Sequence, residues 1–165
     1  MEDVTGGIAA GPMLRAGRVS WAWAWGPVIG WAAVIFALSS LPGGMMAADL
    51  PGVDKLAHAG VFAVLALVIL RALGKVTRWR ASRCVACAII CVAAYGALDE
   101  LHQWFTPQRS VELLDVVADV TGGALASAAW LLNRRVQGAR RLNRSGARGV
   151  EAASPPRPTN LGTNR

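Results

Sequence analysis

Charged side chains are scarce in this chain. Asp, Glu, Lys and Arg make up 16% of its 165 residues, 54% of the residues are hydrophobic, and the mean hydropathy is +0.39. Soluble domains usually carry about 25% charged residues. The composition therefore argues against a water-soluble core and favours one small membrane domain.

Cysteine is nearly absent. Cys84, Cys87 and Cys91 lie in one apolar run with the spacing of a single helix face, and no His or fourth Cys stands near them. That set is incomplete for a metal site. We therefore interpret the three thiols as packing residues.

Two further features are missing. The N-terminus carries Glu2 and Asp3 and lacks the basic n-region of a signal peptide, so we expect no cleavage there. The chain also shows no internal repeat, which many transporters have.

Four apolar segments are long enough to cross a bilayer, which takes about 20 residues. They predict an all-α membrane protein with a four-helix transmembrane bundle at residues 19–133. Residues 1–18 form a segment before it, and 134–165 form a basic, Pro-containing tail that we expect to be disordered. The expected helices are 21–41, 53–74, 83–105 and 111–133.

The basic residues predict the orientation of the bundle. Of the 17 Lys and Arg, 15 fall before the first span, between the second and third, or after the fourth. Only Lys55 and Arg109 fall on the other side. The positive-inside rule therefore places both termini in the cytoplasm. The basic tail then indicates topology and contact with anionic lipid rather than a nucleic-acid partner.

Acidic residues follow the opposite distribution, which the positive-inside rule does not require. Ionisable groups at the ends of membrane-length apolar segments are expensive to keep there, so they indicate a functional site. Seven of the ten acids fall on the outward side: Asp49, Asp54, Asp99, Glu100, Glu112, Asp115 and Asp119.

Helical spacing predicts that these acids face one another. Residues four apart share a helix face, and three expected helices each carry such a polar pair near their outward end. Lipid-facing carboxylates would be costly, so the faces should meet inside the bundle. The pairs are Asp54 with His58, Asp99 with Gln103, and Asp115 with Asp119, and small residues Gly122 and Ala126 continue the last stripe.

Such a cluster supports a limited chemistry. Facing carboxylates with a His can hold a divalent cation, whose identity the sequence does not give. Crowded carboxylates can also act as general acid and base, and cationic side chains at the rim can bind a phosphate. The candidate catalytic residues are Asp99, Glu100, Asp115 and Asp119, and the candidate substrate-binding residues are Lys55, His58, Gln103 and Arg109.

A structural interpretation stands beside the functional one. Asp99, Asp115 and Asp119 can cap helix ends or pair with Arg109 and Lys55, and so lock the bundle. We expect three other polar residues to be solvated at the loops or the rim: Asp49, His102 and Glu112.

Two blocks of sequence resemble a known family. D-K-L-A-H-A-G-V-F-A-V-L-A at 54–66 and D-E-L-H-Q-W-F-T-P-Q-R-S-V-E-L-L-D-V-V-A-D-V-T-G-G-A-L-A at 99–126 are similar to the VanZ-like family, as is S-S-L-P at 39–42. The resemblance covers roughly 19–133. It implies a multi-pass protein of the bacterial cytoplasmic (inner) membrane and links it to the cell envelope, since the family is named for a teicoplanin-resistance member.

These observations lead to one expected function and one alternative. The expected function is binding of a polar or phosphorylated group at the outward acidic site, with a membrane lipid or lipid-linked envelope precursor as partner. The resemblance extends this to teicoplanin susceptibility. The alternative is a non-enzymatic assembly partner or small transporter whose polar cluster locks helix packing. The sequence does not decide whether the protein is an enzyme.

Overall fold

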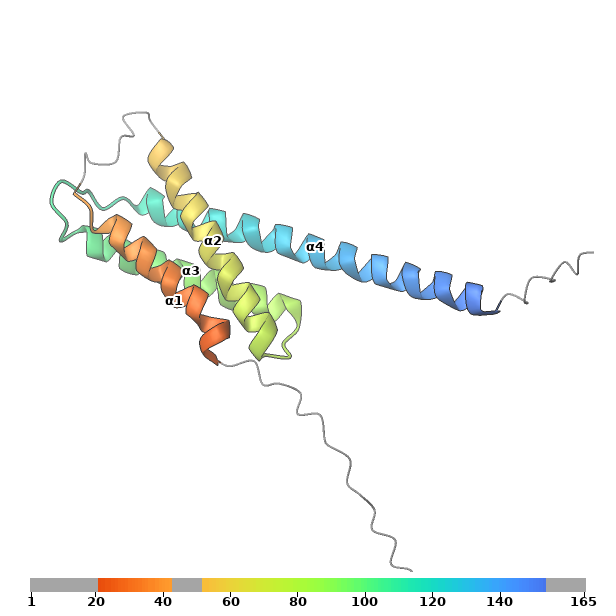
Figure 1. Ribbon diagram of the computed structural model, residues 1–165. Coiled ribbons are helices and arrows are strands. Elements are labelled where there is room, and N and C mark those ends of the chain that lie inside the picture. The colour runs from red at the N-terminus through yellow and green to blue at the C-terminus, as the bar shows by residue number, and fades with distance from the viewer. Residues whose placement is uncertain (1–20, 43–51, 154–165) are drawn as a thin grey trace, which may run out of the picture.

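The chain folds into four helices in a computed structural model that describes residues 21–42 and 52–153. They are α1 (Trp21–Ser39), α2 (Val53–Val76), α3 (Ala81–Gln103) and α4 (Leu113–Ala153) (Figure 1). No strand occurs among the described residues, and all four helices are long and apolar enough to span a membrane. The predicted all-α bundle with four membrane-spanning helices is therefore confirmed. The predicted segment 1–18, Asp49 and residues 154–165 lie outside the described residues.

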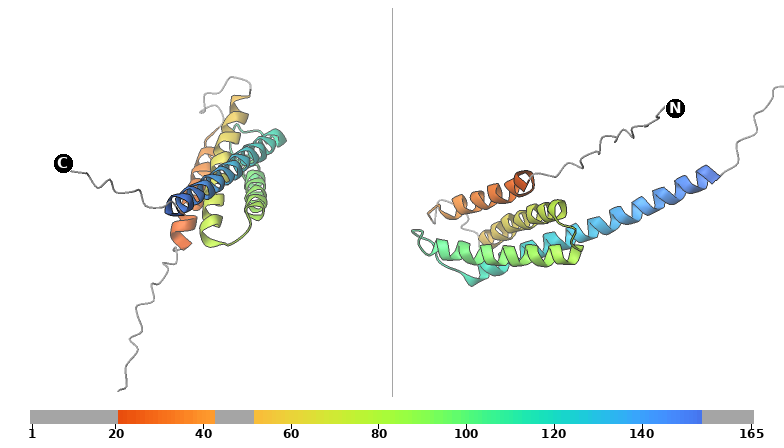
Figure 2. Two further views of the ribbon diagram at one scale, coloured as in Figure 1. Left: turned by 90° about the vertical axis from the view of Figure 1, so that its right-hand side faces the viewer. Right: turned by 90° about the horizontal axis from the view of Figure 1, so that it is seen from below.

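Helix α2 holds the bundle together. It contacts each of the other three helices, and its contact with α4 is the most extensive in the molecule. Figure 2 shows α2 between α1 and α4, with α3 completing the bundle. Because the second and fourth helices cross in contact, residues near the start of each are brought close together.

Apolar side chains fill the core of the bundle and also lie on its surface. Phe62, Leu65 and Leu70 of α2 pack with Val92 of α3 inside the bundle, and Cys84 is buried in the same core. Large apolar side chains also face outward, including Ile29, Phe36, Leu67, Ile90 and Leu125. A helix that is hydrophobic on all sides is typical of a membrane span, because lipid takes the place of a protein neighbour.

Small residues let α4 approach α2 and α3 closely. A Cβ at Gly122 would overlap the backbone carbonyl of Ala59, and one at Gly123 would lie 3.0 Å from the Val92 side chain. A larger residue at 122 would therefore separate α2 from α4. Small residues at a helix interface permit this kind of close approach between backbones.

Helix α4 is longer than predicted. The expected helix ends lie within two residues of the observed ones, except that α4 continues past Asn133 to Ala153. The expectation of disorder from residue 134 is therefore wrong for 134–153. Arg, Ala and Leu in this segment are good helix formers, and no proline interrupts them before Pro155. A high arginine content is therefore compatible with a solvated helix.

Candidate functional site: a buried polar cluster

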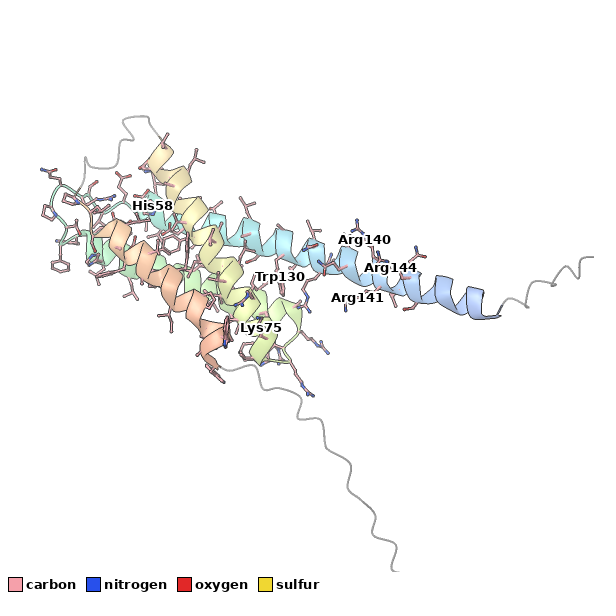
Figure 3. The ribbon with its side chains drawn as sticks, in the orientation of Figure 1. His58, Lys75, Trp130, Arg140, Arg141 and Arg144 are labelled. Carbon is pink, nitrogen blue, oxygen red and sulfur yellow. The ribbon has the colours of Figure 1, made fainter. Side chains whose placement is uncertain are left out.

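Polar side chains are buried at the end of the bundle where α3 is joined to α4. Five of the eight candidate site residues are at most 6% exposed: Asp99, Glu100, Gln103, Asp115 and Asp119. His58 lies at this end of α2 and Lys75 at the opposite end (Figure 3). The structure therefore gathers the predicted polar faces of three helices into one place. We call these five residues, with Ser39, Lys55, His58 and Glu112, the polar cluster.

Lys55 bridges three carboxylates in the part of the cluster nearest the loops. Its Nζ lies 2.8 Å from Oε2 of Glu112, 3.0 Å from Oδ2 of Asp54 and 3.1 Å from Oδ1 of Asp115. An ammonium shared by three carboxylates is a poor candidate for holding a substrate anion. Glu112, expected to be a solvated rim residue, is instead half-buried and paired, because the chain turns back over the start of α2 at this point.

Asp99 joins α3 to α1. Its Oδ1 accepts a hydrogen bond of 2.6 Å from the hydroxyl of Ser39, and its Oδ2 accepts one of 3.0 Å from the amide of Gln103. The predicted Asp99–Gln103 face is thus confirmed. Ser39 was missed as a site residue because a serine near a helix end has many common roles. Its place in the S-S-L-P motif was the available signal.

Glu100 is nearly enclosed but incompletely bonded. It is 4% exposed, and its Oε2 accepts a hydrogen bond of 2.9 Å from the backbone N–H of Glu112. Its Oε1 has no hydrogen-bond partner among the described residues. A buried carboxylate oxygen without a partner is costly, so its occurrence needs an explanation.

His58 and Asp119 link α2 to α4 at the deepest level of the cluster. His58 Nδ1 lies 3.0 Å from Oδ1 of Asp119, whose side chain is fully buried. The second oxygen, Oδ2, lies against Gly96 of α3 and has no hydrogen-bond partner among the described residues. The i, i+4 spacing predicted that Asp119 faces inward, but the part played by Gly96 was not visible in the sequence.

A small cavity opens beside the cluster between α1, α2 and α3. Its volume is about 60 Å³, room for a few water molecules or one phosphate-sized group. One part of its wall is apolar, from residues such as Ile35, Val61 and Phe62. A much smaller part is polar and is formed by Ser39, His58, Asp99, Gln103 and Arg109.

Arg109 lines this cavity but forms no ion pair with the acids of the polar cluster among the described residues. Its Nε donates a hydrogen bond of 3.3 Å to the backbone carbonyl of Leu41. The suggested pair between Arg109 and Asp115 is not formed, since Asp115 binds Lys55. Of the two predicted anion-binding cations, Arg109 therefore lines the cavity and Lys55 does not.

His102 of α3 faces the end of α1. It was expected to be a solvated rim residue, but its Nε2 lies 3.0 Å from the hydroxyl of Ser40 and its ring lies 4.5 Å from that of Phe36. The α1–α3 contact that covers His102 joins residues more than sixty positions apart, so local spacing did not reveal it.

Two groups of side chains have the composition and spacing of a cation site. His58, Glu100 and Asp115 each offer a ligand atom, and these atoms lie within 4.8 Å of one another. Asp54, Glu112 and Asp115 form a second such group. Carboxylate oxygen and imidazole nitrogen are ordinary ligands of divalent ions, so metal binding is within the chemistry of the cluster.

The fold and the cluster define a class: a small multi-pass helical membrane protein with buried carboxylates at one end of its bundle. A protein-family model described as VanZ/LLP1 matches residues 17–134. The chain therefore belongs to the VanZ/LLP1 family, and the resemblance seen in the two sequence blocks is confirmed. No curated protein and no solved structure matches the chain.

Proposed function

We propose that this VanZ-like protein binds the polar group of a membrane lipid or lipid-linked envelope precursor at its polar cluster. In this proposal both termini are cytoplasmic, the membrane is the bacterial cytoplasmic membrane, and the cluster faces outward. The excess of Lys and Arg on the side of the termini supports that orientation.

The observation that carries the proposal is the mixed wall of the cavity. Its apolar side presents Ile35, Leu38 and Val61, and its polar side presents Asp99 and Arg109. Ligand sites commonly combine an apolar lining with a few placed polar groups. An amphipathic molecule satisfies both sides, because its chain stays in the lipid while its polar group enters the cavity.

The cavity size and Arg109 together favour a phosphate as that polar group. A volume of about 60 Å³ leaves room for a small polar group such as a phosphate. A guanidinium forms bidentate hydrogen bonds with phosphate, which an ammonium cannot do. Lys55 is held by three carboxylates, so Arg109 would supply the cation that meets the anion.

The buried carboxylates also give the site the groups of an enzyme. Asp99, Glu100, Asp115 and Asp119 come from two helices and converge in a region with little access to water. Carboxylates in such surroundings can serve as general acid and base or as metal ligands. In this version of the proposal Gln103 orients Asp99, to which it is hydrogen-bonded, and His58 orients Asp119.

A purely structural role is the second candidate, and specific contacts favour it. Ser39–Asp99 joins α1 to α3, His58–Asp119 joins α2 to α4, and Lys55–Asp115 adds a second α2–α4 link. A cluster that only locks the bundle explains these bonds. It does not explain why one oxygen of Glu100 and one of Asp119 lack partners.

Native mass spectrometry from nanodiscs separates the two candidates. The full-length protein would be released from nanodiscs of phosphatidylethanolamine and phosphatidylglycerol doped with a polyprenyl phosphate. We expect the wild type to retain one polyprenyl phosphate, and Arg109→Ala to retain at least tenfold less.

Lys75→Ala is the matched control, because Lys75 lies at the opposite end of the bundle (Figure 3). It should retain the adduct as the wild type does. A bare wild type, folded equally in all three forms, would leave the structural role as the better account. Teicoplanin susceptibility of cells lacking the protein is the corresponding test of the envelope link.

A further inference from the structure

We propose that His58, Glu100 and Asp115 form a binding site for a divalent cation, preferably Mn²⁺ or Zn²⁺. The three residues come from α2, α3 and α4, and their ligand atoms lie within 4.8 Å of one another. Ligand atoms that are each about 2.1 Å from a tetrahedral metal lie about 3.4 Å apart. Side-chain rotations that bring the three atoms closer by roughly 1 Å would therefore close the site.

Glu100 supplies independent support. Its side chain is 4% exposed, and its Oε1 has no hydrogen-bond partner among the described residues. Its other oxygen is held by the backbone N–H of Glu112, which fixes the carboxylate in place. A cation bound by Oε1 would give this oxygen the partner that the protein does not provide.

His58 is arranged as metal-binding histidines usually are. Its Nδ1 lies 3.0 Å from Oδ1 of Asp119. In the tautomer with the proton on Nδ1, this N–H would donate to the carboxylate and Nε2 would keep its lone pair for a metal. A carboxylate behind a ligand histidine fixes both its tautomer and its orientation. Asp119, fully buried and resting against Gly96, would thus act as a positioning residue for His58.

The charges decide between the two possible cation sites. In the group formed by Asp54, Glu112 and Asp115, the ammonium of Lys55 already lies within 3.1 Å of all three carboxylates. A metal there would have to displace it. Asp115 binds Lys55 through Oδ1, so its Oδ2 would bind the cation at the deeper group, beside His58 and Glu100.

The ligand types indicate which ions fit. Two carboxylates and one imidazole suit Mn²⁺ or Zn²⁺ better than Ca²⁺, which takes an all-oxygen shell. This inference deepens the proposed function. Binding of the cation does not depend on that function, but the presence of a phosphate beside the cation does. Because His58 also lines the cavity, a bound cation would face a phosphate held by Arg109 and offset the repulsion between that phosphate and the carboxylates.

Metal binding can be measured on the full-length protein in detergent without any lipid ligand. After dialysis against a chelator, Mn²⁺ would be titrated and followed by electron paramagnetic resonance, with the bound metal counted by mass spectrometry. We expect one ion per chain in the wild type and at least tenfold weaker binding in Glu100→Gln. Asp54→Asn, in the group whose carboxylates already bind Lys55, should bind within twofold of the wild type.

Spin-echo spectroscopy of wild-type protein with bound Mn²⁺ should show coupling to one imidazole nitrogen. This result does not depend on whether Glu100→Gln folds. A folded wild type without bound Mn²⁺ or Zn²⁺, bound Mn²⁺ without nitrogen coupling, or loss of binding in Asp54→Asn alone would each overturn the inference. Polyprenyl phosphate retained by such a metal-free protein would leave the proposed lipid binding standing.

Discussion

The carboxylate of Asp119 fits against Gly96 of the neighbouring helix. A Cβ at position 96 would lie 2.6 Å from Oδ2 of Asp119 and 3.3 Å from its Cβ. The absence of a side chain at Gly96 therefore makes room for a buried acid on α4. Since the other oxygen of Asp119 meets His58, Gly96 also determines where that histidine lies.

Gly96→Ala should displace Asp119 and destabilise the bundle. Alanine is the better helix former, but overpacking a buried contact costs about 1–3 kcal/mol, which outweighs the gain of about 1 kcal/mol in helix propensity. Thermal unfolding in detergent measures the difference. Gly60→Ala is the control, because a Cβ at Gly60 meets nothing within 4 Å. Equal stability of the two variants would contradict the tight fit at Gly96.

Two adjacent serines provide a second matched comparison. Ser39 donates to Asp99 inside the bundle, whereas the Ser40 hydroxyl bonds at the exposed surface. Ser39→Ala leaves a buried carboxylate oxygen without its donor and should lower the free energy of unfolding by about 1.5–3 kcal/mol. Ser40→Ala should cost less than about 1 kcal/mol. Denaturation by sodium dodecyl sulfate measures both, and a larger loss for Ser40→Ala would refute this ranking.

Lys55 should stabilise the protein because its ammonium offsets the repulsion among three carboxylates. Lys55→Gln leaves Asp54, Glu112 and Asp115 close together without a cation. We therefore expect a lower melting temperature, and partial recovery when Glu112→Gln removes one of the acids. Lys75→Gln, at the other end of the bundle, is the control and should melt with the wild type. If the double variant melted below Lys55→Gln, repulsion among the acids would not be the cause.

Accessibility of introduced cysteines tests the orientation. After replacement of the three native cysteines by alanine, Ser110→Cys should react with a membrane-impermeant maleimide in intact cells. Arg78→Cys, in the turn between α2 and α3, should react only after permeabilisation. This follows from the positive-inside rule. The reverse pattern would place the polar cluster on the cytoplasmic side.

The end of α4 should be dispensable for folding of the bundle. Residues 132–145 are exposed. Truncation after Arg135 keeps the contact in which Arg134 lies 4.8 Å above the ring of Trp130. The melting temperature should therefore change little, whereas truncation after Gly123, which removes buried Ser127, should prevent folding. A large loss of stability in the first truncation would show that the bundle depends on the exposed half of α4.

The sequence predicted the parts of this structure that depend on local pattern. Apolar length located the four spans, and i, i+4 spacing placed Asp99 with Gln103 and turned Asp119 inward. Proximity of residues far apart in the chain was harder to predict. Ser39 meets Asp99, Gly96 receives Asp119, and Glu112 reaches Lys55, and each contact depends on which helices pack together.

The error that covers the most residues concerns α4, because a basic tail expected to be disordered is helical as far as Ala153. Solvated arginines are good helix formers, so only the proline at 155 was a strong reason for the helix to end. The sequence also could not predict how deeply the acidic side chains are buried. Composition could show that acids and apolar segments adjoin, but not that one oxygen of Glu100 would be left without a hydrogen-bond partner.

The length of α4 has an electrostatic consequence. Its 41 residues measure about 61 Å, roughly twice the 30 Å of a bilayer's hydrocarbon. With residues 113–133 across the membrane, Arg134 lies at the surface and Arg144 about 15 Å farther along the helix. Figure 3 labels Arg140, Arg141 and Arg144 on this part of α4. Screening acts over about 8 Å at physiological salt. Attraction to anionic lipid should therefore be strongest at Arg134 and Arg135 and weak at Arg144.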